Sequence, residues 1–334
     1  MKEIYPGIFL IEEKGRFRPK DNIFVLAGTD GLIFDAGYGN KGSVKQFLKK
    51  YKEIEEYYKE HKREFRITRI IVSHAHSDHF SGLNEISNAL GLKIILTKNI
   101  AAKIKDRVSF NRSYQVDDYE DNLRIRKNIV RKIWGYLRNL GENTVYKRIF
   151  GLSYLNRPDG IIEENSEIVI NGENWNIFNS PGHSPDHISL YNEAKGILFS
   201  GDNVLKQRST WLGPPESIIT DYIKTIKKYQ NLPNIKLILP AHGEIIENPK
   251  ETLNAILTRM KEREEQLLAA IKKHSENGLS PEKLTKIIYN RNRKFIQIIA
   301  RDWIVLTLKK LEKESLIKRR IIKRKILFFP VDKG

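Results

Sequence analysis

The sequence contains no cysteine, so disulfide bonds and thiolate metal ligands are both excluded. Any bound metal must therefore be held by histidine, aspartate or glutamate. The sequence also lacks a run of about 18 apolar residues, so we expect no membrane span. The opening residues, MKEIYPGIFL, have neither a long apolar stretch nor a small-residue cleavage site, so they do not resemble a secretory signal, and we expect a cytoplasmic protein.

Acidic residues are scarce relative to basic ones. The chain of 334 residues has 59 lysines and arginines against 41 acidic residues, a net charge of +18. Residues 255–334 alone carry 21 basic and 9 acidic residues, which is 12 of that excess. A generally lysine-rich composition explains such polarity poorly, so we expect an anionic partner, such as nucleic acid.

The pattern of apolar residues predicts an α/β protein of one large or two unequal domains. Short apolar runs before residue 40 predict strands with a turn at 28–31, helical spacing covers 41–64, and ITRIIVS (67–73) predicts a buried strand. Further strands are expected at 93–97, 167–170, 174–181, 187–193, 196–202 and 235–243, with a helix at 216–230. The polar segment 98–160 is either a helical insertion that forms a lid or a solvated surface insertion.

The last quarter of the chain has a different pattern. Residues 251–277 predict a connecting helix, and 278–334 predict two helices followed by a two-stranded ribbon, which is the order of a winged-helix domain. The segment IKRRIIKRK (317–325) places six basic residues on that ribbon. Tyr289, Phe295 and Trp303 are expected either in the core of this small domain or stacked on bases.

Three histidines and an aspartate crowd into SHAHSDHFSG (73–82), directly after a predicted strand, in a chain with eight histidines. Imidazole and carboxylate groups are ligands for zinc, and also for iron or manganese. Three later loops add candidate ligands after apolar runs. The candidates are His74, His76, Asp78 and His79 in the first loop, and His183, His187, Asp202 and His242 in the later ones.

These motifs resemble the metallo-β-lactamase superfamily over about residues 1–250. The resemblance implies a four-layered αββα sandwich with a site for two metal ions at one edge. His74, His76 and His183 would hold one ion, Asp78, His79 and His242 the other, and Asp202 would bridge them. Asp35 would be structural. The expected cofactor is two Zn²⁺, with iron or manganese as possible substitutes. A hydroxide shared by the ions would be the nucleophile, and Asp78 would help to orient it.

Three functions are compatible with this pattern. The favoured one is a phosphodiesterase, an endoribonuclease on single-stranded RNA, because the C-terminal module resembles the branch of the superfamily that contains β-lactamase-like protein 2. The alternative is hydrolysis of a small acyl compound such as a thioester, lactone or β-lactam, although no tyrosine follows Asp202 as it does in the lactonases of the superfamily. The third is a non-catalytic nucleic-acid-binding protein. His187 would either donate a hydrogen bond to substrate or orient a ligand, and a homodimer is compatible with all three.

Overall fold

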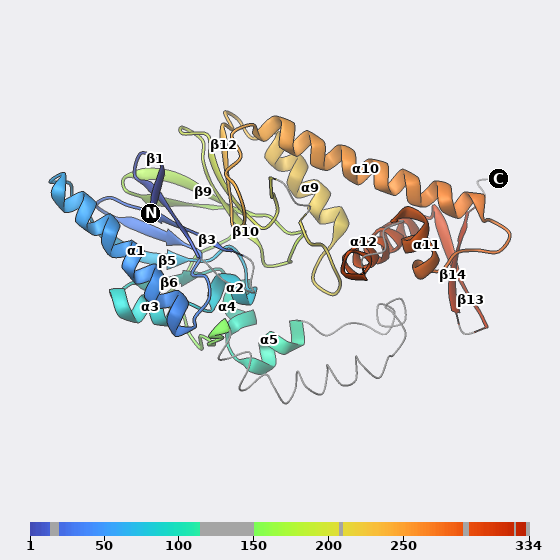
Figure 1. Ribbon diagram of the computed structural model, residues 1–334, viewed down its shortest axis with the longest axis horizontal. Coiled ribbons are helices and arrows are strands. Elements are labelled where there is room, and N and C mark those ends of the chain that lie inside the picture. Colours follow the sequence, from blue (N-terminus) through green and yellow to red (C-terminus); the bar gives the residue numbers. More distant parts are fainter. Residues whose placement is uncertain (14–19, 114–149, 207–209, 290–293, 324, 332–334) are drawn as a thin grey trace.

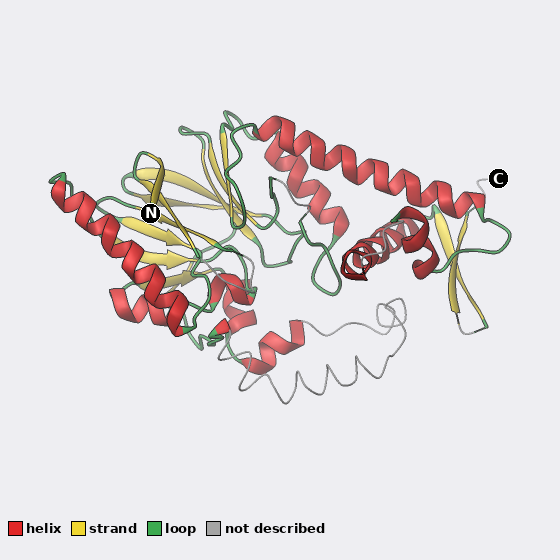
Figure 2. Ribbon diagram, in the orientation of Figure 1, coloured by secondary structure: helices red, strands yellow, loops and turns green. Residues whose placement is uncertain are grey.

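The computed structural model describes residues 1–13, 20–113, 150–206, 210–289, 294–323 and 325–331, and for residues 294–299 it describes the backbone only. None of the helices in these ranges is both long enough and apolar enough to cross a membrane. Two β-sheets with helices on their outer faces form the larger part of the molecule (Figure 1; Figure 2).

The first sheet has seven strands that lie side by side in chain order. Its first four strands pair antiparallel and the remaining pairs are parallel. The strands are β1 (Lys2–Tyr5), β2 (Ile8–Glu12), β3 (Asn22–Leu26), β4 (Gly31–Phe34), β5 (Ile67–Ile71), β6 (Lys93–Leu96) and β7 (Gly160–Ile161).

The second sheet has five strands in the order β12-β11-β10-β9-β8, antiparallel except for the parallel pair β11 and β12. The strands are β8 (Ser166–Ile170), β9 (Glu173–Asn179), β10 (Ile188–Asn192), β11 (Ile197–Gly201) and β12 (Leu237–Pro240). The expected strands and the turn at 28–31 are thereby confirmed.

The two sheets pack face to face because their strands alternate in side-chain direction. On β11, Ile197 and Phe199 point into the core shared by both sheets, whereas Leu198 points to the opposite face. The Phe199 ring lies 5.0 Å from that of Phe24 and 5.6 Å from that of Trp175, measured between centroids. This aromatic group joins the first sheet to the second.

Helices cover both outer faces and complete the four-layered αββα sandwich that the sequence predicts. The first sheet is covered by α1 and α3, and the second by α9 (Figure 1). The helices of this part are α1 (Lys41–Glu60), α2 (Ser77–Phe80), α3 (Leu83–Leu90), α4 (Lys98–Ile104), α5 (Arg107–Ser113) and α9 (Ile219–Gln230). Of the expected insertion 98–160, α4, α5 and residues 150–160 are described, and 114–149 lie outside the described residues.

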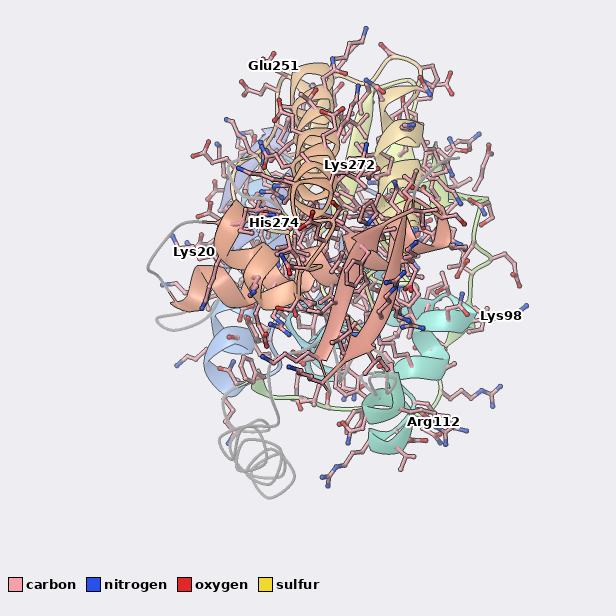
Figure 3. All side chains as sticks on the ribbon, turned by 90° about the vertical axis from the view of Figure 1, so that its right-hand side faces the viewer. Lys20, Lys98, Arg112, Glu251, Lys272 and His274 are labelled. Atoms are coloured by element: carbon pink, nitrogen blue, oxygen red, sulfur yellow. The ribbon has the colours of Figure 1, made fainter. Side chains whose placement is uncertain are left out.

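The C-terminal part begins with the long helix α10 (Pro249–Lys273), followed by α11 (Pro281–Ile288), α12 (Lys294–Lys313) and the antiparallel ribbon of β13 (Ile317–Ile322) and β14 (Lys325–Pro330). Leu279 adds a bridge to Phe328 on the ribbon. Figure 3 views the molecule from this end, with Lys272, His274 and the ribbon toward the viewer. The order of elements is the expected one, and the winged-helix assignment and the domain boundaries stay predictions.

Among the described residues, the apolar core of the C-terminal part is continuous with the outer face of the second sheet. One apolar cluster runs from Tyr191 and Leu198 on the outer face of the second sheet, through α9 and α10, to Ile304 and Leu308 on α12. Trp303 belongs to this cluster and is 5% exposed, so it is a core residue and cannot stack on bases. Tyr289 packs against the same cluster, and the side chain of Phe295 lies outside the described residues.

Candidate metal centre

The seven predicted ligands come from four loops that meet at one edge of the sandwich. His74 and His76 follow β5, and Asp78 and His79 lie on the single turn of α2. The other three ligands follow strands of the second sheet: His183 comes after β9, Asp202 after β11 and His242 after β12. Loops at the ends of rigid strands hold functional side chains accurately, because the sheets fix where each loop begins.

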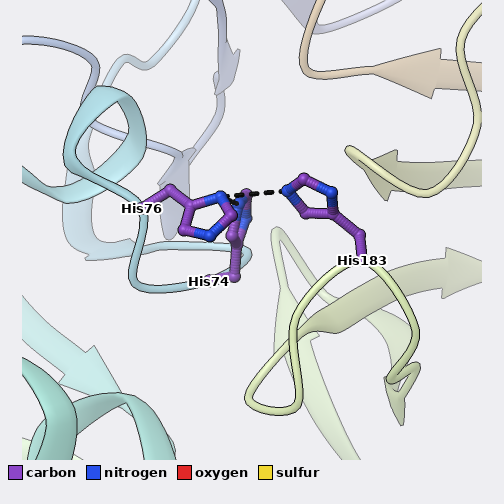
Figure 4. Close-up of side chains that lie close together, drawn as sticks. All are labelled: His74, His76 and His183. Carbon is purple, nitrogen blue, oxygen red and sulfur yellow. Dashed lines mark hydrogen bonds between the residues drawn. The ribbon is translucent and has the colours of Figure 1, made fainter. Parts of the chain in front are cut away.

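His74, His76 and His183 form the first donor group. The Nδ1 atom of His76 lies 2.9 Å from Nε2 of His74 and 2.9 Å from Nε2 of His183 (Figure 4). Figure 4 shows the His183 ring approaching from its own loop, opposite the loop that carries the other two rings. Three imidazole nitrogens therefore face one point, which is the geometry that a cation with nitrogen ligands requires.

A second donor group lies beside the first. Asp78, His79 and His242 place one ligand atom each within 4.8 Å of one another. The two groups share Asp202: its Oδ1 lies 3.2 Å from Nε2 of His242 and 3.8 Å from Nε2 of His79, and its Oδ2 lies 3.5 Å from Nε2 of His183. The structure thus brings all seven predicted ligand residues together, with Asp202 between the groups.

Each of the five histidines is held through the ring nitrogen that faces away from the centre. Such outer contacts fix the tautomer and the orientation of a ligand. Nδ1 of His183 donates to the carbonyl of Trp211 (2.8 Å), and Nδ1 of His242 lies 2.8 Å from the carbonyl of Lys20. The remaining contacts are His74 Nδ1 to Ser73 Oγ at 3.0 Å, His79 Nδ1 to Asp35 Oδ2 at 3.3 Å, and His76 Nε2 to Glu216 Oε2 at 2.7 Å.

Asp35 has the structural role that the resemblance implies. Its Oδ1 accepts the backbone N–H of Ser73 at 2.7 Å, directly before the histidine motif. Its backbone has a φ of 66°, in the left-handed region that aspartate tolerates better than most residues.

The contacts of Lys20, Lys103, Asp186, Trp211 and Glu216 were not expected from the sequence. Glu216 lies between prolines and an apolar run in GPPESII, and Lys103 is one of many lysines, so neither has a local pattern that marks it. Asp186 alone had a usable signal, because it lies between His183 and His187 in SPGHSPDH.

Burial and charge divide the histidines into two kinds. Burial, reinforced by neighbouring imidazoles, lowers the pKa of His74 and lowers that of His183 to about 4, so both rings are neutral. Burial also opposes the charge of His79, but the carboxylates of Asp35, Asp78 and Asp202 raise its pKa to about 10. The carboxylates around His79 therefore attract positive charge, which a divalent cation would supply in exchange for a proton.

The residues present fit a pair of metal ions. Nε2 of His79 is buried and makes no hydrogen bond, and it lies 3.8 Å from the buried Oδ1 of Asp202. Leaving a buried imidazole nitrogen unpaired is costly, and a cation between these two atoms would bind both of them. Donors of this kind, nitrogen and carboxylate oxygen without sulfur, suit zinc, iron or manganese.

The ring of His187 faces the backbone of Asp202 and not the two donor groups. The backbone N–H of Asp202 donates to its Nε2 (3.2 Å), and its Nδ1 lies 2.8 Å from Oγ of Ser180. Burial, together with the neighbouring His183, lowers its pKa to about 3, so the ring is neutral. Gly201 packs on this ring so closely that an added Cβ would lie 2.4 Å from Nε2. These contacts favour the expected role of orienting a ligand over that of a donor to substrate.

Several curated proteins are similar to this chain in sequence. Two curated relatives, the beta-lactamase-like protein 2 homologs of Caenorhabditis elegans and Drosophila melanogaster, are 26% and 28% identical to the chain over 47% of its length. The matches span 51% and 52% of those relatives, about half their length. An atrochrysone carboxyl ACP thioesterase of Aspergillus fumigatus is 24% identical over 75% of this chain and 59% of its own.

Solved structures share the fold over nearly the whole chain. A beta-lactamase domain protein of Burkholderia ambifaria superposes with a TM-score of 0.73 at 16% identity, covering 99% of this chain and 93% of its own. A metallo-beta-lactamase family protein of Thermus thermophilus superposes with a TM-score of 0.67 at 16% identity, covering 98% of this chain and 100% of its own. The sequence model of the Metallo-beta-lactamase superfamily matches residues 16–242, and the chain therefore belongs to that superfamily.

Proposed function

We propose that the protein is a hydrolase that depends on two divalent metal ions, with zinc as the expected metal. The observation that carries this proposal is the position of Asp202, whose two carboxylate oxygens face different donor groups. A carboxylate in that position is suited to bridge two ions. All seven proposed ligands lie within the described ranges.

In this proposal each group has a separate task. When bound, the pair of ions would lower the pKa of a water molecule toward about 7 and polarise the scissile carbonyl or phosphoryl oxygen. His74, His76 and His183 would hold one ion, and Asp78, His79 and His242 the other. Asp78, the least enclosed carboxylate of the set, would also accept a hydrogen bond from the attacking water and so orient it.

The test combines metal content with turnover. His76→Ala and Asp202→Ala should each lose at least one equivalent of tightly bound zinc and should abolish turnover on every substrate. His61→Ala is the matched control, because His61 is an exposed histidine at the end of α1 and should leave both readouts unchanged. Substantial turnover in either ligand variant would contradict the proposal.

For the substrate, we propose single-stranded RNA cleaved as a phosphodiester. Support comes from the ribbon of β13 and β14, where Lys318, Arg320, Lys323 and Lys325 are exposed. Exposed lysine and arginine bind phosphates of any sequence through release of counterions. Ile321 at the end of the ribbon is 75% exposed, so an apolar surface lies beside the charges and could contact unstacked bases.

A second candidate, hydrolysis of an acyl thioester, is favoured by one comparison. The curated thioesterase of Aspergillus fumigatus aligns over 75% of this chain, a larger share than the two relatives described before it. Metal chemistry of this kind serves carbonyl carbon and phosphorus alike, so the seven ligands do not separate the candidates.

The deciding experiment assays the zinc-loaded protein in parallel on single-stranded RNA, a thioester, a lactone and a cephalosporin. It includes the double variant Lys318→Glu with Lys323→Glu, which reverses charge on the ribbon without touching the core. If RNA is the substrate, this variant should bind RNA more weakly, and the slope of log affinity against log salt should fall by about 0.7 per lost phosphate contact.

The matched control is Lys45→Glu with Lys49→Glu, two exposed lysines on α1, which belongs to the sandwich and not to the C-terminal part (Figure 1). Both double variants should keep the same kcat/KM on a thioester. RNA turnover that is equal in the two double variants would mean that the ribbon does not bind the substrate, and turnover of the thioester alone would establish the second candidate.

A further inference from the structure

A lysine is buried beside the metal centre, between two carboxylates from other parts of the chain. Lys103 on α4 is 8% exposed, and its ammonium lies 3.0 Å from Oδ1 of Asp186 and in direct contact with Oε1 of Glu216. Both carboxylates are also buried, at 3% and 4% exposure. A buried lysine is rare unless paired, and here one cation is shared by two anions.

Each carboxylate uses its other oxygen to hold a different part of the histidine motif. Oε2 of Glu216 accepts from Nε2 of His76 at 2.7 Å, which leaves Nδ1 of that ring to face the centre. Oδ2 of Asp186 accepts the backbone N–H of Ala75 at 2.7 Å, between the two histidines of the motif. One lysine therefore supports both the ring of His76 and the backbone that carries it.

The ammonium of Lys103 lies between the carboxylates of Asp186 and Glu216 and compensates their charges. Without a cation, two buried carboxylates would face each other, and their repulsion would displace one of them. A displaced Glu216 could no longer accept the Nε2–H of His76. His76 is also the only histidine of the described cluster that faces the centre through Nδ1, so its ring angle depends on this contact.

We infer that Lys103 and Glu216 are positioning residues that set the metal affinity of the first donor group, formed by His74, His76 and His183. The inference rests on the proposed function, because it presumes that this group holds a metal ion. Both residues act through His76. The histidines of the second donor group are held instead by Asp35 and by the carbonyl of Lys20, so the affinity of that group should be independent of Lys103 and Glu216.

The test is a titration of the metal-free, full-length protein with Zn²⁺ in competition with a chromophoric chelator. His183→Ala and His242→Ala first assign the two zinc equivalents to the first and second donor groups. In Glu216→Gln and Lys103→Met, the first equivalent should then bind about tenfold to a hundredfold more weakly, as is typical when a partner of a ligand is lost, and the second should stay within about twofold. Lys103→Arg should restore part of the loss.

The control is Lys310→Met, which removes a lysine held between Glu264 and Glu314 in the C-terminal part and should leave both equivalents unchanged. If Lys103→Met does not fold, Glu216→Gln, which keeps size and packing, decides alone. If both zinc equivalents bound equally more weakly, the role of these residues would be purely structural and the inference would be overturned. An unchanged, wild-type affinity for the first zinc equivalent would also overturn it. A wild-type protein that binds no zinc would instead overturn the proposed function itself.

Discussion

Replacing Gly201 with alanine should destabilise the protein far more than replacing another glycine of similar backbone conformation. Gly201 has a φ of +50°, and a side chain in this left-handed region costs about 1–2 kcal/mol. An added Cβ would also lie 2.4 Å from Nε2 and 2.8 Å from Cε1 of His187. That ring is fully buried, so it cannot move without losing its hydrogen bonds.

The size of the clash follows from the same contacts. Overfilling a packed core costs about 1–3 kcal/mol, and the lost hydrogen bond to the N–H of Asp202 adds about 1 kcal/mol. Gly91 is the matched control, since its φ is +67° and an added Cβ would meet nothing within 4 Å. The Gly201→Ala variant should therefore lose about 2–4 kcal/mol more free energy of unfolding than Gly91→Ala.

The measurement is urea unfolding of both metal-free variants, followed by a Zn²⁺ titration. Because His187 supports the backbone of Asp202, Gly201→Ala should also bind zinc more weakly, and Gly91→Ala should not. Equal losses of unfolding free energy in the two variants would refute the reasoning, because they would mean that the backbone conformation is the whole effect.

Three further predictions concern the core, the metals and pH. Phe199→Ala should lower the free energy of unfolding by about 3–5 kcal/mol in urea, since its buried ring joins the two sheets, and a loss below about 1 kcal/mol would contradict that packing. Removing metal with a chelator should lower the melting temperature, because each ion present at 100 times its Kd stabilises the fold by about 2.7 kcal/mol; an unchanged melting temperature would argue against metal binding. Burial opposes ionisation of Asp186, but Lys103 and Ser184 lower its pKa to about 2. The ionised carboxylate therefore adds about 2 kcal/mol to the free energy of unfolding above pH 4, and this contribution is lost as the pH falls to 2. The difference in free energy of unfolding between the wild type and Asp186→Asn should decrease from pH 4 to pH 2. A difference that stays constant would mean that the pKa of Asp186 is not lowered.

The fold and the ligand residues could be predicted from the sequence because their signals are local. Apolar runs such as ITRIIVS mark buried strands, and the next residues carry the histidines, so the strand and the ligand loop are found together. The α1 helix was equally clear, because its apolar residues repeat at helical spacing and are buried in the structure, among them Val44, Phe47 and Ile54.

The supporting contacts could not be predicted, because they join residues that are distant in the chain. Lys103 and Glu216 are 113 positions apart, and neither stands out among 59 basic and 41 acidic residues. The environment of Trp303 is a similar case. Its place on α12 was expected, but whether that face meets solvent or α10 depends on how the C-terminal part docks against the second sheet.

The continuous apolar cluster from Leu198 to Leu308 has a consequence for synthesis of the chain. During translation α9 and α10 emerge before α12, which ends at Lys313 and packs on the apolar side chains that these two helices contribute to the cluster. Until then the nascent protein exposes an apolar surface of the kind that chaperones bind. A stop codon before the end of α12 should therefore yield an insoluble product and not a smaller, folded protein.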